Sequence, residues 1–313
     1  MSSATRTAFL LQVHKNPDQI NAFIHQLISN GQADVFIHVD KQNAKELNDK
    51  ITTGSRVKIL EQNIDCIWGD ISQVDTTLLL LREAVNAKND YDYVCLRSGQ
   101  DLLVRNGFKD FLAANNGRLF FRLKEVSHDN LGLMHINWPK ITRKRYSAVH
   151  PIRIYRRLLQ GFYRHGMNIL PNKQYFPEDY QFYVGSQWFT IPLEAAQYIV
   201  DFIDDNPWYY RFFENTLCPD EWFFTTLMMN SEYKHQVIND NFMFLKWGVK
   251  FGERNSPTYL TNDDIQAIEA SGHFFARKFD ASVDSDVIDY FSRKVSLQSN
   301  EATVSGNQAV HGL

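Results

Sequence analysis

Short apolar segments alternate with amphipathic segments along residues 8–104, and this alternation restricts the fold more than any other feature of the sequence. Short apolar runs are typical of buried strands, and apolar residues at helical spacing predict helices between them. The predicted strands are Ala8–Val13, Asp34–Val39, Val57–Leu60 and Asp92–Leu96, and the predicted helices are Ala44–Ile51, Ser72–Val85 and one from Pro17 to just before Gly31. Strands separated by helices form right-handed crossovers and parallel pairs. The predicted fold class is therefore α/β, with a mostly parallel central sheet flanked by helices.

Polar residues follow three of these strands: His14 and Lys15, Asp40 and Lys41, and the run Ser98–Asp101. In a parallel sheet, ligands bind at the carboxyl ends of the strands. We therefore predict that residues 8–129 form a nucleotide-binding half. His14 and His38 end adjacent strands, and they either line this pocket or are ordinary hydrogen-bonded histidines.

The second half of the chain differs in charge. Residues 130–177 contain no Asp or Glu but nine Lys and Arg residues. A strand is predicted over Gln181–Ile191 and a helix over Leu193–Ile203. We predict one catalytic domain over residues 1–297, with its acceptor and catalytic half over 130–297. The polar, aperiodic residues 298–313 predict a disordered tail.

Composition excludes several classes of protein. The chain has 313 residues, a formal net charge of −3 and three cysteines. Mild acidity argues against general nucleic-acid binding, and so few cysteines fit a reducing compartment. The N-terminal residues lack the apolar core of a signal peptide, and apolar runs fall short of the ~20 residues that cross a bilayer. The predicted location is the cytoplasm.

The basic segment Pro151–Arg164 places Leu158, Leu159 and other apolar residues near one helical face, with arginines around them. This pattern is typical of an interfacial helix on anionic lipid. It is equally compatible with a lid over a phosphorylated ligand, or with an amphipathic helix packed on its own domain. The first alternative predicts peripheral contact with the inner membrane face through residues 151–164.

Pro219, Asp220 and Glu221 precede an apolar and aromatic helical run. Proline and acidic residues are favoured in a first helical turn, so the motif is compatible with a simple helix start. Alternatively, one carboxylate faces a cleft and acts as a general base, because burial beside Trp222 and Phe223 would raise its pKa. The motif alone leaves both interpretations open.

Six segments of the chain occur in the order found in a known family. They are IHVDK at Ile37–Lys41, WGDIS at Trp68–Ser72, YDYVCLRSGQDLLV at Tyr91–Val104, GSQWFTIP at Gly185–Pro192, CPDEWFFTTLMMNS at Cys218–Ser231 and FFARKFD at Phe274–Asp280. Together they resemble the core-2/I-branching enzymes, glycosyltransferase family fourteen, which also includes the peptide xylosyltransferases. The resemblance implies a GT-A-type fold and an inverting transfer of a sugar from a UDP-sugar, without a metal ion.

The resemblance also assigns roles to single residues. Glu221 matches the family's catalytic base, and Asp40 matches the aspartate that contacts the uracil. Lys278 matches the lysine that meets the diphosphate.

Further positions have weaker counterparts in the family. Trp247 matches an acceptor-contacting tryptophan, and Glu125 lies where the family has an acceptor-binding glutamate. A family arginine on the diphosphate has no clear counterpart, and Arg254 or Arg277 is the candidate. We expect the polar strand ends to complete the donor site through His14, Lys41, Ser98 and Asp101.

No metal ion is predicted. Asp90, Tyr91 and Asp92 form an Asp-x-Asp triplet, but it precedes a strand, whereas metal-binding triplets of this fold follow one. Without a metal, fixed cations must stabilise the departing UDP. Arg277 and Lys278 are the local candidates, because guanidinium and ammonium groups both bind phosphate.

The predicted function is the transfer of a sugar to a saccharide hydroxyl with formation of a β-linkage. We expect UDP-N-acetylglucosamine as the donor, with UDP-xylose and UDP-glucose as alternatives. Few cysteines and no membrane span indicate a bacterial member that builds cell-surface glycans, with a lipid-linked acceptor as one option. Two other classes stay open: a glycoside hydrolase that uses Glu221 with Asp101, and a catalytically silent carbohydrate-binding protein.

Overall fold

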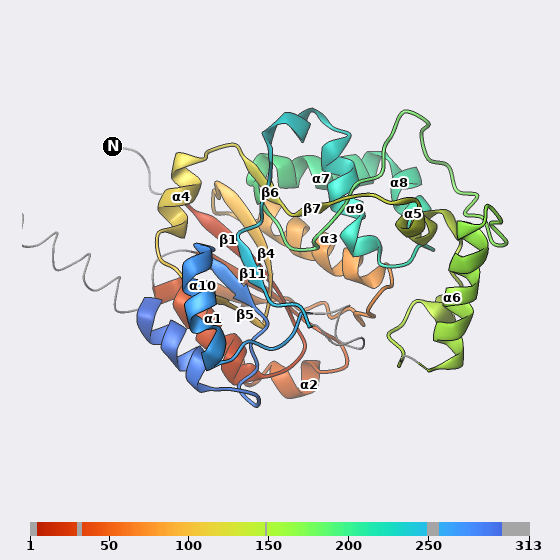
Figure 1. Ribbon diagram of the computed structural model, residues 1–313. Helices are drawn as coiled ribbons and strands as arrows, with labels where there is room; N and C mark the ends of the chain where they lie inside the picture. The colour runs from red at the N-terminus through yellow and green to blue at the C-terminus, as the bar shows by residue number, and fades with distance from the viewer. Residues whose placement is uncertain (1–4, 30–32, 148, 249–256, 296–313) are drawn as a thin grey trace, which may run out of the picture. The chain divides into compact units, whose positions relative to one another are not determined.

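The computed structural model describes residues 5–29, 33–147, 149–248 and 257–295, which divide into two compact units (Figure 1). Unit 1 combines segments within residues 1–63, 89–116 and 242–313, and unit 2 combines residues 64–88 and 117–241. The chain therefore passes between the units several times. The predicted division of function at residue 130 stays a prediction, and the predicted tail over 298–313 lies outside the described residues.

Unit 1 contains a parallel arrangement of strands in the order β4-β1-β2-β3. The strands are β1 (Thr7–Val13), β2 (Ala33–Val39), β3 (Val57–Ile59) and β4 (Tyr93–Ser98). In register, Phe9 of β1 lies beside Val35 of β2 and Cys95 of β4. All seven residues of β1 are buried, as expected for a central parallel strand. The predicted α/β fold class is confirmed.

A smaller sheet of unit 1 has the order β11-β12-β5. Its strands are β11 (Met243–Leu245), β12 (Phe275–Arg277) and β5 (Asp101–Leu103), of which β5 alone is antiparallel to its neighbour. The helices of unit 1 are α1 (Pro17–Ser29), α2 (Ala44–Leu47), α4 (Phe108–Ala114), η4 (Asn262–Asp264), α10 (Ile265–Ser271) and residues 286–295. Phe9, Phe23, Phe108 and Phe275 pack ring against ring, so aromatic contacts join the two sheets and their helices within this unit.

Unit 2 is mostly helical. Its helices are α3 (Ser72–Val85), α5 (His128–His135), η1 (Lys140–Thr142), α6 (Pro151–Arg164), α7 (Leu193–Asp205), α8 (Pro207–Phe213), η2 (Pro219–Glu221), α9 (Phe223–Met229) and η3 (Glu232–Gln236). Its strands are β6 (Leu119–Phe121), β7 (Leu123–Lys124), β8 (Val184–Gly185), β9 (Thr190–Pro192) and β10 (Val237–Asn239). Strand β6 pairs with β10 in parallel and with β9 in antiparallel fashion, and β7 pairs with β8.

Two predicted elements are shorter in the structure. The single strand predicted over Gln181–Ile191 is wrong, because only β8 and β9 form within it. The Ser186 hydroxyl accepts a hydrogen bond from the Trp188 N–H at 3.2 Å, and this local turn interrupts the extended run. The helix predicted over Ala44–Ile51 ends at Leu47, where Asn48 and Asp49 follow, both residue types that compete with helical hydrogen bonding. Among the described residues, no helix is both long and apolar enough to span a membrane.

Candidate functional site

The carboxyl end of β1 leads into a cationic cluster in unit 1. Lys15, two residues beyond β1, donates hydrogen bonds to Asp280 Oδ2 at 2.6 Å and to the Tyr259 hydroxyl at 3.1 Å. Lys278 Nζ lies 5.0 Å from the centre of the Tyr259 ring, and Lys15 Nζ lies 5.3 Å from it. Tyr259 thus holds two ammonium groups at the same edge of the sheet. Neither Tyr259 nor Asp280 is predicted from the sequence as a site residue, because both are distant from β1 along the chain.

A second part of the cluster comes from the antiparallel pairing of β5 with β12, which places Asp101 opposite Arg277. Arg277 Nε lies 3.4 Å from Asp101 Oδ1, while Asp101 Oδ2 accepts the Ser98 N–H at 3.0 Å. Asp101 is fully buried, and its two oxygens restrict the orientation of the Arg277 side chain and of the backbone at the end of β4. The structure therefore brings together four residues that were predicted for the donor site. They are Ser98, Asp101, Arg277 and its neighbour in the chain, Lys278.

Backbone hydrogen bonds fix the position of Lys278. Its carbonyl accepts the Leu260 N–H at 2.9 Å, and the next residue, Phe279, donates to the Gln100 carbonyl at 2.9 Å. The segment after β12 is thereby tied to the turn after β4. This tie places the end of β12 beside the carboxyl end of β4, and the carboxyl ends of parallel strands are where such a sheet presents its ligands.

The charges of the cluster shift the pKa values of its members. Burial alone would raise the pKa of Asp280, but hydrogen bonds from Lys15 and Ser282 lower it to about 2. Burial would also raise the pKa of Tyr259, and the hydrogen bond and charge of Lys15 together with Lys278 outweigh it, so the net shift is downward. Partial desolvation, followed by the charge of Lys15, lowers the pKa of His14. The shifts of Asp280 and Tyr259 reflect the neighbouring lysines, whereas burial is the main cause for His14; positive charge beside Tyr259 suits an anionic ligand.

Asp40 and its neighbours close the end of β2. The Asp40 N–H donates to the Val13 carbonyl at 2.9 Å, so the ends of β1 and β2 are joined. Asp40 Oδ1 accepts the Gln42 N–H at 2.9 Å, and Lys41 is exposed beside it. His38 is buried within the strand, and burial lowers its pKa to about 4. Of the two interpretations of His38, the structure supports the buried histidine and not the pocket-lining one.

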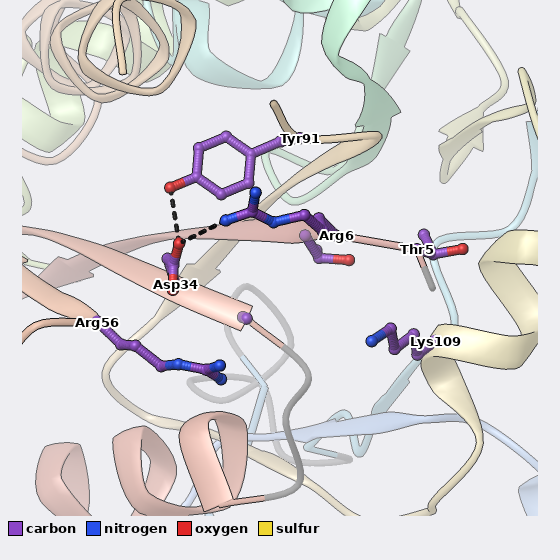
Figure 2. A pocket seen from close by; sticks show the side chains of 8 residues that line it. Thr5, Arg6, Asp34, Arg56, Tyr91 and Lys109 are labelled. Atoms are coloured by element: carbon purple, nitrogen blue, oxygen red, sulfur yellow. Dashed lines mark hydrogen bonds and ion pairs between the residues drawn. The ribbon is translucent and has the colours of Figure 1, made fainter. Parts of the chain in front are cut away.

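A basic pocket lies at the opposite end of the parallel strands of unit 1 (Figure 2). Tyr91 donates to Asp34 at 3.0 Å and Arg6 lies 3.8 Å from the same carboxylate, while Arg56 and Lys109 line the rim (Figure 2). The cavity measures about 100 Å³, well below the ~300–1,000 Å³ of small-molecule sites. It also lies at the amino ends of the strands, and we do not assign the donor site to it.

Glu221 ends the 3₁₀ turn η2 of unit 2. The turn begins after Cys218, whose φ of 56° reverses the chain, and Pro219 occupies its first position. Glu221 Oε2 lies 3.0 Å from Lys124 Nζ, and the two side chains keep 43% and 46% of their surface exposed. The Glu221 carboxylate is therefore accessible from solvent and is ion-paired with a lysine.

Asp220, next to Glu221, has the perturbed environment that was predicted for this motif. Burial, followed by the charge of Glu221, raises the pKa of Asp220 to about 7. Its Oδ1 atom has no hydrogen-bond partner within the described part of the chain, and the same holds for Trp222 Nε1. The burial expected beside Trp222 therefore affects Asp220, whereas Glu221 stays accessible.

The remaining predicted site residues are more scattered. Glu125 follows Lys124 in unit 2 and is exposed. Trp247 of unit 1 forms a β-bridge with Pro257 and exposes 49% of its surface, which leaves its ring available for stacking. Arg254 lies outside the described residues.

The Asp-x-Asp triplet precedes β4, as the sequence indicates. Asp92 Oδ2 accepts the Arg6 N–H at 2.6 Å, and Tyr91 contacts Asp34, so two members of the triplet hold the start of the sheet. Across the described residues, no group of three or more His, Cys, Asp or Glu side chains has the arrangement of a metal site.

Fold and cluster define an α/β protein whose sheet edge carries fixed cations suited to a phosphorylated ligand. Residues 134–269 match the family described as Core-2/I-Branching enzyme. With the relatives described next, this match supports the resemblance of the six segments to the core-2/I-branching enzymes.

The chain is similar to several xylosyltransferases. It is 24% identical to Xylosyltransferase sqv-6 of Caenorhabditis elegans over 92% of this chain and 36% of that protein. It is 24% identical to Xylosyltransferase 1 of Homo sapiens over 93% of this chain and 31% of that protein. For the Xylosyltransferase of Ciona intestinalis the identity is 23%, over 93% of this chain and 34% of that protein. The chain spans about a third of the length of these curated relatives.

Proposed function

We propose that this chain is an inverting glycosyltransferase that moves a sugar from a UDP-sugar to a saccharide hydroxyl without a metal ion. In the reaction, the acceptor oxygen forms a bond to the anomeric carbon while the bond from that carbon to the diphosphate breaks. The acceptor proton goes to a base, and UDP departs with the bonding electron pair. One displacement inverts the configuration and gives a β-linkage from an α-linked donor.

The observation that carries this proposal is the cationic cluster at the strand ends of unit 1. Lys15 and Lys278 flank Tyr259, and Arg277 is held by the buried Asp101. Cations that are already oriented stabilise the charge that develops on a leaving diphosphate at little reorganisation cost. Asp40, at the end of β2, is the proposed contact of the uracil.

Glu221 is the proposed base. It is exposed enough to reach an acceptor hydroxyl, and the ion pair with Lys124 restricts the orientation of its carboxylate. A single displacement needs one base and no nucleophilic carboxylate. Glu125 and Trp247 are the proposed acceptor contacts, and the acceptor remains a saccharide of unspecified structure.

The hydrolase alternative has weaker support. Its example pairing of Glu221 with Asp101 is disfavoured, because the Asp101 side chain is fully buried and engaged by Arg277 and by the Ser98 N–H. A carboxylate in that position cannot meet a glycosidic bond. The intact motifs Pro219–Glu221 and Arg277–Lys278 argue against the alternative of a silent carbohydrate-binding protein.

The donor sugar is the open part of the proposal. Sequence analysis favours N-acetylglucosamine, whereas the relatives described above are named xylosyltransferases, which supports UDP-xylose. UDP-glucose is the third candidate. The cytoplasmic location, the bacterial origin and the lipid-linked acceptor stay predictions.

The test uses the purified chain with UDP and with the three UDP-sugars in excess EDTA. We expect UDP to raise the melting temperature, because a ligand that binds only the folded state stabilises it by mass action. One UDP-sugar should release UDP, and simple glycosides should accelerate this release. Absence of both stabilisation and release would contradict the proposal, and activity that appears only with manganese would contradict its metal-free part.

A further inference from the structure

Helix α6 of unit 2, which is labelled in Figure 1, carries a stripe of exposed apolar side chains. Ile154, Leu158 and Phe162 are spaced i, i+4 and i+8, so they lie on one face of the helix. Their exposed fractions are 47%, 56% and 40%. Large apolar side chains that align in this way commonly mark an interaction surface.

The opposite face of α6 fixes the helix on its own unit. Leu159 is buried in a small core with Ile136, Trp138 and Leu217. The Tyr163 hydroxyl lies 2.6 Å from His135 Nδ1, and His150 accepts the Ile152 N–H at the helix start. The packed-helix alternative is therefore correct for this face only. The outward stripe is not needed to hold the helix in place.

Positive charge runs beside the stripe. Arg153, Arg157 and Arg164 are spaced i, i+4 and i+11, which places them on the neighbouring face of α6. Arg153 donates to the Tyr146 carbonyl at 3.2 Å, and Arg164 pairs with Asp129 at 3.2 Å in an exposed ion pair. Residues 130–177 as a whole contribute nine cations and no carboxylate.

Not every basic residue of this segment faces outward. Arg143 is buried and lies 2.8 Å from Asp70, so it belongs to the core of unit 2. Burial lowers the pKa of Arg156, whose guanidinium lies 5.8 Å from the centre of the Tyr146 ring. On α6 itself, the outward charge lies at Arg153, Arg157 and Arg164.

We propose that this α6 face, Ile154, Leu158 and Phe162 with Arg153, Arg157 and Arg164, binds the surface of an anionic lipid bilayer. The apolar stripe would enter the boundary between head groups and acyl chains, and the arginines would meet lipid phosphates. Further exposed apolar residues lie close to α6 in the chain, namely Ile141, Val149, Met167 and Ile169.

Charge argues for an anionic bilayer over a second copy of the chain. Two copies that met through α6 would bring their arginine-rich faces together, and like charges at short distance repel. An anionic bilayer instead attracts each basic residue near its surface by about 1 kcal/mol. Insertion of the helix face into the head-group region would also bury Ile154, Leu158 and Phe162. A partner that bound only through charge would leave these side chains in water.

The test is vesicle flotation of the full chain, which needs neither donor nor acceptor and so is independent of the proposed activity. The probes are vesicles of phosphatidylcholine alone and vesicles with 30% phosphatidylglycerol. The variants are Leu158→Glu in the stripe and Val283→Glu in unit 1. Both replace an exposed apolar residue by glutamate, so they change the net charge equally. Circular dichroism checks that both variants are folded.

We expect the wild type and Val283→Glu to float with the anionic vesicles and not with phosphatidylcholine alone. Leu158→Glu should reduce the bound fraction at least about tenfold, and high salt should release the wild type. Failure to bind anionic vesicles, equal binding to both kinds of vesicle, or equal binding by Leu158→Glu would overturn the proposal. If the wild type does not float, but sedimentation shows a dimer that Leu158→Glu dissociates, the α6 face would instead bind a second copy of the chain.

Discussion

Lys15 and Asp280 are 265 positions apart in the sequence, yet Lys15 Nζ lies 2.6 Å from Asp280 Oδ2. This contact joins the loop after β1 to the segment after β12, and it holds an ammonium group where the parallel strands end. The Tyr259 hydroxyl accepts a second hydrogen bond from the same lysine. The position of Lys15 is thus determined by two residues from the far end of the chain.

The Lys15–Asp280 contact predicts a pH dependence of stability. The folded-state pKa of Asp280, about 2, lies below its ordinary value of 3.8, so its stabilisation is present above pH 4 and is lost as the pH falls toward 2. Asp280→Asn should lower the free energy of unfolding at pH 7 by about 1–2 kcal/mol. Urea titrations at pH 7 and pH 3 measure this difference. A deficit that is equally large at both pH values would show that the ion pair is not its cause.

Lys15 should contribute to nucleotide binding. Removal of one charged hydrogen-bond donor to a phosphate weakens binding by about 1.5–3 kcal/mol, so Lys15→Met should weaken UDP binding roughly 10- to 100-fold. Lys45→Met removes the same charge from the exposed surface of α2 and serves as the control. Calorimetric titration with UDP compares the three proteins. Equal losses in both variants would attribute the effect to net charge alone.

Glu221→Gln should separate chemistry from binding. The variant keeps the size of the side chain but cannot accept the acceptor proton, so turnover should fall by roughly 10²–10⁴-fold while UDP affinity stays nearly constant. Glu232→Gln, on the exposed turn η3, is the matched control. Initial rates with the best donor and UDP titration provide the two readouts. Turnover within twofold of the wild type would exclude Glu221 as the base.

The raised pKa of Asp220 predicts a pH dependence of folding stability opposite to that of Asp280. Its folded-state pKa of about 7 lies above the ordinary value of 3.8, so the folded state binds more protons and stability falls as the pH rises from about 4 to about 7. Asp220→Asn removes this charge, and it should therefore melt a few degrees higher than the wild type at pH 8. The two melting temperatures should converge near pH 4. A variant that is less stable than the wild type at pH 8 would mean that Asp220 is ionised and stabilised there.

Much of the fold is predictable from the sequence because it depends on local pattern. The helix Ser72–Val85 has the predicted bounds, since its apolar residues repeat at helical spacing. The strands β1 and β2 differ from their predictions by one residue, because continuous apolar runs are typical of buried parallel strands.

The parts that escaped prediction depend on contacts between distant segments. Tyr259 and Asp280 acquire their roles only when the chain after β12 returns to Lys15. The turn within Gln181–Ile191 is a local exception: it depends on Ser186 accepting a hydrogen bond from the nearby Trp188 N–H, which apolar periodicity does not report. For Asp220 and Glu221, the sequence predicts one buried carboxylate but not which of the two it is.

The central claim is that built-in cations, and no metal ion, bind the diphosphate. Calorimetric titration of UDP in excess EDTA into the wild type and Lys278→Ala tests it most directly. We predict binding by the wild type and a loss of roughly 10- to 100-fold in Lys278→Ala. Wild-type binding that requires a divalent cation, or a Lys278→Ala variant with unchanged affinity, would contradict the claim.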